Sequence, residues 1–212
     1  MRHLIIAFAL LILAPARAFA AGTHGFQLEV DAAGALPSGT YEFGGRASSL
    51  LDQGGAVFGK FLFGLSHKFY IGGGVGYIRN RKDFTSTTLL DTRPPRDWSG
   101  QRTVEAIPVL LLAQMRSETH RKLSWYGEGG LGVTNFDRRL SNLSFGQPPV
   151  ANFQTGLSYL VGAGVCVGMG RNFELLLGAD YLQSFTGTGT LWRSGDNPAY
   201  MLGSLGLRYP RW

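Results

Sequence analysis

Eight charged residues stand singly among glycine, serine and apolar residues. They are spread along most of the chain and comprise six acids and two bases: Glu29, Asp31, Lys60, Glu105, Glu128, Glu174, Asp180 and Arg208. An isolated charge in apolar surroundings is costly unless it is paired and hydrogen-bonded. These residues therefore predict a buried polar network, which serves either to pack an interior or to gate an ion pathway.

Hydrolytic chemistry has few candidate residues in this chain. It commonly needs a histidine base beside a nucleophile or a positioned water, and beyond residue 20 the histidines are His24, His67 and His120. Ser66 precedes His67, but neighbouring residues on a strand point to opposite faces. Four further acids lie in segments rich in turn residues, where solvated carboxylates are the ordinary case: Asp83, Asp91, Asp97 and Asp137. We therefore expect no catalytic residues, no cofactor and no metal site.

The elements that must position the charged residues are predicted by hydrophobic periodicity. In residues 157–169, every second residue from Leu157 is apolar or amphipathic, and the residues between them are mostly small. The pattern resumes after the turn "GRN", and six other segments are predicted to be strands, five of them with a clear period of two. Alternation of this length predicts strands rather than helices. The eight predicted strands begin near Phe26, Val57, Phe69, Arg102, Leu123, Leu157, Phe173 and Met201.

The predicted strand at residues 102–116 is apolar on both faces, so its orientation depends on its one acid. Glu105 is grouped with the other single charges on the inner face. We therefore expect four residues of this strand to point outward: Val104, Ala106, Leu110 and Leu112.

The connections between the predicted strands alternate in length. The short turns "SHK", "SETHRK" and "GRN" alternate with longer segments at residues 35–54, 81–101, 137–154 and 186–198. An even number of strands joined in this way is typical of a transmembrane barrel, in which closure of the sheet satisfies every backbone group. A soluble barrel would carry charge on its outer face, whereas here the second face holds mainly glycine, serine and single charges. The predicted fold is all-β: an eight-stranded antiparallel up-and-down transmembrane β-barrel with short periplasmic turns, long extracellular loops and a packed polar lumen.

The chain has features of an exported protein. Residues 1–20 predict a secretory signal peptide, because a charged start precedes an apolar run and small residues. The barrel domain then spans residues 21–212, with both termini in the periplasm. The single cysteine, Cys166, cannot form an internal disulfide. No Lys/Arg-rich run indicates a nucleic-acid partner.

Three stretches resemble the small outer-membrane β-barrel superfamily around outer-membrane proteins A and X: "VEAIPVLLLAQMR", "LSWYGEGGLGV" and "MLGSLGLRYPRW". The resemblance implies a place in the outer membrane of a Gram-negative bacterium, in contact with lipid and lipopolysaccharide. It also implies insertion by the barrel-assembly machinery. Because side chains can fill the interior of an eight-stranded barrel, we favour a packing network over an ion pathway.

Basic residues fall near the expected outer rim, where lipopolysaccharide presents phosphates that arginine binds through its fork of donors. The candidate lipopolysaccharide contacts are Arg79, Arg81, Lys82, Arg102, Arg138 and Arg139. The expected function is non-enzymatic: a structural or surface-interaction role, with loops presented to an extracellular partner that the sequence does not name. Two alternatives remain, an outer-membrane enzyme that modifies lipid A or phospholipid and a narrow ion-conducting pore.

Overall fold

The computed structural model describes residues 25–41, 45–46, 52–88, 96–117, 123–142, 147–169, 173–186 and 197–211. These residues form strands and turns, and they include no helix long and apolar enough to cross a membrane. The predicted signal peptide at residues 1–20 lies outside the described residues.

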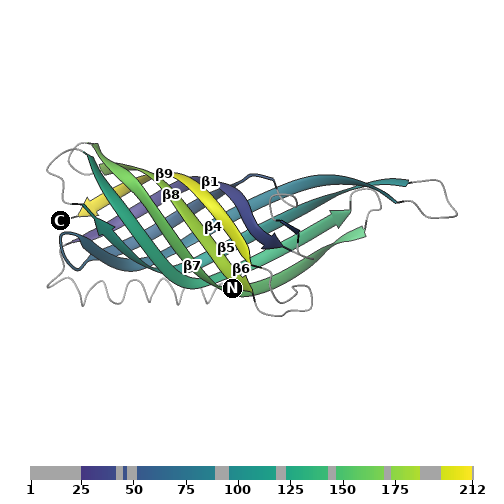
Figure 1. The fold of residues 1–212 in the computed structure, drawn as a ribbon, viewed down its shortest axis with the longest axis horizontal. Helices are drawn as coiled ribbons and strands as arrows, with labels where there is room; N and C mark the ends of the chain where they lie inside the picture. The colour runs from purple at the N-terminus through teal and green to yellow at the C-terminus, as the bar shows by residue number, and fades with distance from the viewer. Residues whose placement is uncertain are drawn as a thin grey trace.

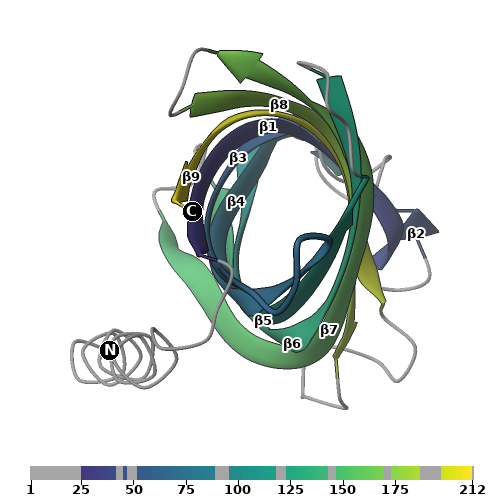
Figure 2. The ribbon, with the colours of Figure 1, turned by 90° about the vertical axis from the view of Figure 1, so that its left-hand side faces the viewer.

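Eight long strands close into a barrel (Figures 1 and 2). Each pairs antiparallel with the next, and the last pairs back to the first. The short β2 (Gly45–Arg46) pairs with the end of β1. The barrel strands are β1 (Phe26–Tyr41), β3 (Gly54–Gly64), β4 (Phe69–Thr88), β5 (Arg96–Arg116), β6 (Leu123–Asn142), β7 (Gln147–Met169), β8 (Phe173–Thr186) and β9 (Pro198–Arg211). The predicted eight-stranded antiparallel barrel is confirmed.

The pairing register fixes how steeply the strands are inclined. Starting from Gln27 on β1 and following hydrogen-bonded partners once around the barrel leads back to β1 at Pro37, ten residues farther along. With strands about 4.8 Å apart and a rise of about 3.3 Å per residue, this shift tilts the strands by about 40° to the barrel axis. Each step from a residue to its cross-strand partner, taken in the order β1, β3 and on to β9, therefore moves towards one end of the barrel. This is the end opposite the short turns.

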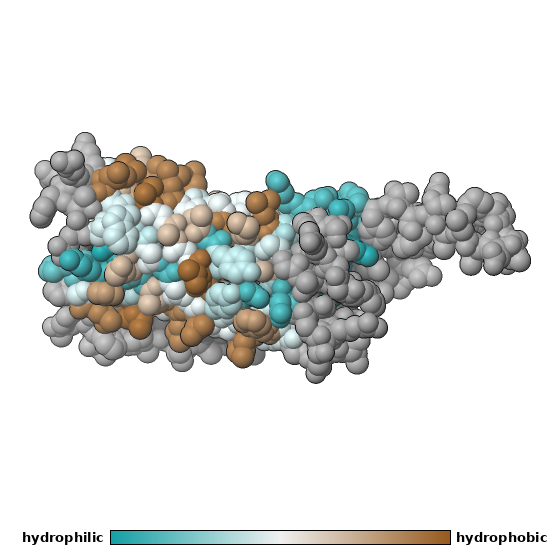
Figure 3. Space-filling view, viewed as in Figure 1, coloured by the Kyte–Doolittle hydropathy of each residue, from teal (hydrophilic) through white to brown (hydrophobic). Residues whose placement is uncertain are grey.

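An apolar belt covers the outer face of the barrel. Leu111, Leu131 and Leu157 are 70–74% exposed, and Figure 3 shows brown apolar residues over the barrel wall. Aromatic residues border the belt near the short turns: Phe26, Phe61, Phe63, Phe69, Trp125, Phe173 and Tyr209. Another group lies nearer the projecting ends: Tyr77, Tyr159, Tyr181 and Phe185.

The height of the belt fits a membrane. Phe69 and Arg79 lie ten residues apart on β4. At the tilt above, these residues are about 25 Å apart along the barrel axis. This matches the apolar band of about 25 Å in outer-membrane barrels. The outer face therefore meets lipid.

The orientation of β5 is opposite to the one predicted. Val104, Ala106, Leu110 and Leu112 are at most 4% exposed and point into the lumen, whereas Leu111 is 74% exposed on the outer face. Because both faces of β5 are apolar, the single residue Glu105 was a poor guide. Two other polar residues of β5, Gln114 and Arg116, share the face of Val104 and indicate the correct orientation.

Strands β4 to β7 continue into residues that were expected to be connections. β4 and β5 pair up to Thr88 and Arg96, and β6 and β7 pair up to Asn142 and Gln147. The extended pair of β4 and β5 projects to the right in Figure 1. Hydrophobic periodicity does not detect these extensions because they leave the apolar belt, so neither of their faces needs to be apolar.

Candidate functional site

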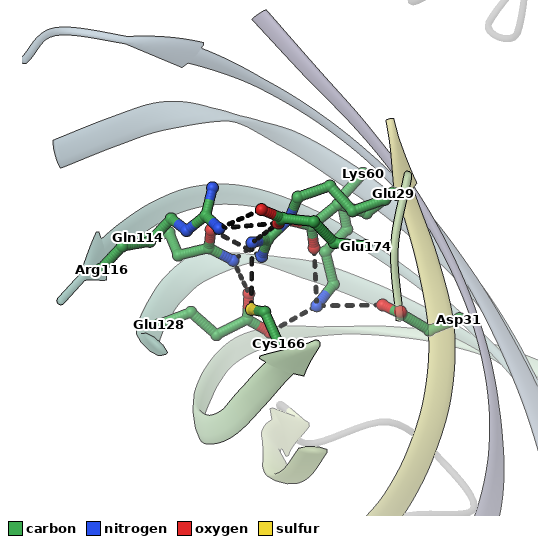
Figure 4. Close-up of polar contacts among 9 residues, drawn as sticks. Glu29, Asp31, Lys60, Gln114, Arg116, Glu128, Cys166 and Glu174 are labelled. Atoms are coloured by element: carbon green, nitrogen blue, oxygen red, sulfur yellow. Dashed lines mark hydrogen bonds and ion pairs between the residues drawn. The ribbon is translucent and has the colours of Figure 1, made fainter. Parts of the chain in front are cut away.

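The lumen contains two layers of buried side chains. Nearer the short turns lies a polar network, shown in Figure 4, that includes Glu29, Asp31, Lys60, Gln114, Arg116, Glu128, Cys166, Glu174 and Arg208. Beyond it, towards the projecting strands, lies an apolar layer that includes Phe58, Ile78, Val104, Leu110, Phe136, Leu160, Leu182, Tyr200 and Leu202. The prediction of a polar lumen therefore applies to only one of these two layers.

Lys60 is the cationic centre of the polar network. Its ammonium nitrogen Nζ donates to Glu128 Oε1 at 2.5 Å and lies 3.2 Å from Asp31 Oδ2 and 3.9 Å from Glu29 Oε2. Lys60 is 4% exposed. Glu29 is its cross-strand partner on β1, whereas Glu128 reaches it from β6 across the lumen. The lysine is thus enclosed by carboxylates from β1 and β6.

Arg208 joins the first and last strands from inside the barrel. Its guanidinium donates through Nε to Glu29 Oε1 at 2.6 Å, through Nη1 to Glu174 Oε2 at 3.2 Å, and through Nη2 to Gln114 Oε1 at 3.0 Å. Nη1 also donates to the Cys166 sulfur at 3.2 Å. Arg208 is fully buried, so these partners replace the water that its charge would otherwise require.

Two members of the network were missed by sequence reasoning. Arg116 Nη2 donates to both carboxylate oxygens of Glu174, at 2.7 and 2.8 Å. Gln114 Nε2 lies 3.3 Å from an oxygen of Glu29 and 3.3 Å from one of Glu128. Both residues lie on β5, and the inverted assignment of that strand placed them on the outer face. Their alternate spacing directly after the apolar run at residues 106–113 was the available signal.

The structure separates one predicted lumen residue from the rest. Glu29, Asp31, Lys60, Glu128, Glu174, Asp180 and Arg208 face the lumen. Glu105 instead faces outward at the outer rim, with its carboxylate 3.6 Å from Arg79 Nε and 3.9 Å from Arg139 Nη2. Its assignment to the lumen was wrong for the same reason as the orientation of β5.

Glycines make room for two luminal aspartates. The side chain of Asp31 lies over its cross-strand partner Gly206, and that of Asp180 lies over Gly162. In each case a carboxylate oxygen occupies the space that a Cβ on the glycine would need. Asp180 Oδ2 accepts a long hydrogen bond of 3.5 Å from Ser204 Oγ.

The six basic residues predicted at the outer rim differ in exposure and pairing. The side chains of Arg79 and Arg81 are each 55% exposed, that of Arg139 is 50% exposed, and that of Lys82 is 29% exposed beside Asp52. Arg102 and Arg138 are partly buried.

Arg139 is held more tightly than Arg79 or Arg81. It donates to Asp137 Oδ2 through Nε at 3.0 Å and Nη2 at 2.5 Å. This hydrogen-bonded carboxylate raises the pKa of the Arg139 guanidinium above its usual value, so Arg139 stays charged.

Three buried hydroxyl groups are bonded to one another. Ser158 Oγ lies 2.7 Å from Thr134 Oγ1 and 2.6 Å from Ser184 Oγ, which links β6, β7 and β8 inside the barrel. Across the described ranges, no group of three or more histidine, cysteine or acidic residues is placed to hold a metal ion. The chemistry that this interior supports is charge pairing and packing.

Comparison with known protein families matches residues 6–209 to the outer membrane protein beta-barrel domain. The chain belongs to this family. A barrel of this family is expected to resemble other small outer-membrane proteins, and it does. Neisserial surface protein A (NspA) is 17% identical with a TM-score of 0.54, over 90% of this chain and 99% of that one.

A second similar structure is Ail, the attachment invasion locus protein of Yersinia pestis, determined in complex with the heparin analogue sucrose octasulfate. It is 19% identical with a TM-score of 0.51, over 88% of this chain and 99% of that one. No curated protein sequence matches the chain. Family and fold place this outer-membrane β-barrel protein in the outer membrane.

Proposed function

We propose that the protein is a non-enzymatic, sealed barrel that anchors an extracellular surface in the outer membrane. The observation that carries this proposal is the filled lumen. In the described residues, the polar network and the apolar layer lie one above the other, and Arg208, Ile78 and Tyr200 are all fully buried. An eight-stranded barrel is narrow enough for side chains to fill it in this way.

The surface that the barrel presents is formed by the projecting ends of β4 to β7. These ends extend beyond the apolar belt as paired strands, and binding residues concentrate on loops that a rigid scaffold of this kind holds in place. In the proposed orientation, both termini and the short turns lie in the periplasm and the projecting ends lie outside the cell. Lipid and lipopolysaccharide surround the belt, and the barrel-assembly machinery inserts it.

The enzyme alternative receives less support from the interior. A hydrolase needs a base beside its nucleophile, and the hydrogen bonds of Ser158 run to Thr134, Ser184 and a backbone carbonyl. The ion-pore alternative requires a wet path through the apolar layer, whose central members Ile78, Leu182 and Tyr200 are fully buried.

Two measurements test the proposal. First, the purified protein in planar lipid bilayers should show no discrete conductance steps, and steady ion conduction would contradict a sealed lumen. Second, single cysteines should be labelled with a membrane-impermeant maleimide on intact cells. Asp83→Cys, beyond the belt on β4 at a position whose side chain is 68% exposed, should react, whereas Ser66→Cys, in a short turn, should react only after the outer membrane is permeabilised.

The wild-type chain is the control for labelling, because Cys166 is 1% exposed and should not react. The reverse labelling pattern would refute the proposed orientation.

A further inference from the structure

Two arginines of β4 lie one above the other on the lipid-facing side of the outer rim. Arg79 and Arg81 continue the outward face of β4 after Tyr77, which is 41% exposed. Both arginine side chains are 55% exposed. Residues two apart on one strand face are about 7 Å apart, a spacing at which two guanidinium groups can hold one phosphate between them.

The ion pairs of these two arginines are loose. Arg79 Nε is 3.6 Å from Glu105 Oε1, and Arg81 Nε is 3.4 Å from Asp83 Oδ1. Arg139, by contrast, forms two short hydrogen bonds with Asp137. Exposed ion pairs contribute little to stability, whereas a phosphate accepts charge-assisted hydrogen bonds from several guanidinium donors. Arg79 and Arg81 are therefore placed to exchange their carboxylates for a phosphate.

The wall beside Arg79 is open. Its cross-strand partner on β3 is Gly55, which pairs with Gly34 on β1, which in turn pairs with Gly203 on β9. A Cβ on any of these three glycines would meet nothing within 4 Å. We call Gly203, Gly34 and Gly55 the glycine path.

The glycine path connects the rim to the apolar belt. Because the strands are tilted, this ladder row rises from the belt to Arg79, and its length along the wall is about 14 Å at about 4.8 Å per strand. Exposed apolar residues border it on both sides: Leu36, Val57, Met201 and Leu205. The path is thus a strip of the outer wall that has no side chains of its own, is bordered by apolar residues and ends at Arg79.

We propose that Arg79 and Arg81 bind the phosphate of one outer-leaflet lipid, whose acyl chain lies along the glycine path. A lipid fits better than a free phosphate, because the arginines face the membrane boundary and the glycine path beside them is continuous with the apolar belt. The inference rests on the proposed orientation, which places this rim in the outer leaflet. It names one wall of the barrel, β4 with β3, β1 and β9, as the binding side.

The test measures lipid binding to the refolded barrel in detergent by native mass spectrometry, with lipid A carrying its phosphates as the probe. Wild type should retain one lipid A. The double variant Arg79→Gln/Arg81→Gln should bind at least tenfold more weakly. Lys68→Gln, which removes a charge from the exposed turn before β4 at the opposite end of the barrel, should bind as wild type does.

A second pair of variants tests the acyl chain. Gly55→Leu fills the path and should weaken binding severalfold. Gly59→Leu is its matched control, because Gly59 lies on the same face of β3 with equally open space but outside the path. A heat-dependent shift in gel mobility equal to that of wild type shows that each variant is folded.

Four outcomes would overturn the inference. The first three are equal binding of dephosphorylated lipid A, unchanged binding by the arginine double variant, and equal effects of Gly55→Leu and Gly59→Leu. Displacement of lipid A by millimolar inorganic phosphate alone would likewise overturn a site that needs the acyl chain. None of these results bears on conductance or on labelling from outside the cell, so failure here is distinct from failure of the proposed function.

Discussion

Replacing Lys60 by methionine should destabilise the barrel by about 3–5 kcal/mol, the usual cost of removing one partner from a buried ion pair. Methionine approximates the length of the lysine side chain, so the substitution removes the ammonium and leaves little cavity. Asp31 and Glu128 lose their nearest cation, of which Glu128 is the closer at 2.5 Å, and Glu29 loses a second cation beside Arg208. Because the site is 4% exposed, water cannot easily replace the lost partner.

The assay is equilibrium unfolding of the refolded protein in urea and detergent, followed by tryptophan fluorescence. The control Lys68→Met lies in an exposed turn and should change the free energy of unfolding by about 0.5 kcal/mol or less. The double variant Lys60→Met/Glu128→Leu should recover part of the loss, because it removes a charge left without its partner. A loss below about 1 kcal/mol for Lys60→Met would refute the view that this network is dry and tightly coupled.

Further outcomes follow in the same unfolding assay. Arg208→Lys loses the fork that reaches Glu174 and Gln114 and should cost about 2–3 kcal/mol; a neutral effect would contradict the bonding described. Gly206→Val meets the carboxylate of Asp31 and should cost about 1–3 kcal/mol, whereas Gly203→Val, which points into open space, should cost clearly less. Glu105→Gln should cost under about 1 kcal/mol, because its arginine partners are half exposed, and a larger loss would indicate a luminal position.

The fold was predictable because period-two alternation reports directly on which solvent each face meets. Leu28, Leu131 and Leu205 were assigned to lipid by parity alone, and all are exposed on the barrel wall. The method failed on β5, where both faces are apolar for different reasons: Leu111 faces lipid, whereas Leu110 faces the apolar layer of the lumen. Parity cannot separate two apolar environments.

It was harder to predict which luminal residues contact one another than to predict which residues face the lumen. Parity places Lys60 and Glu128 on the inner face, but their contact depends on how high each residue lies in the barrel. That height follows from the shift of ten residues around the sheet, which emerges from pairing between all the strands. The division of the lumen into polar and apolar layers has the same origin, because each layer collects residues from strands far apart in sequence.

The closing contact between β1 and β9 constrains when the protein can fold. Paired residues run from Phe26 with Arg211 to Gly39 with Pro198, and inside the wall Arg208 binds Glu29 from 179 residues away. Until its last strand is available, a nascent chain therefore has an open edge and lacks the arginine that binds Glu29. Folding must follow synthesis and export, and the chain must be kept from aggregating during that interval.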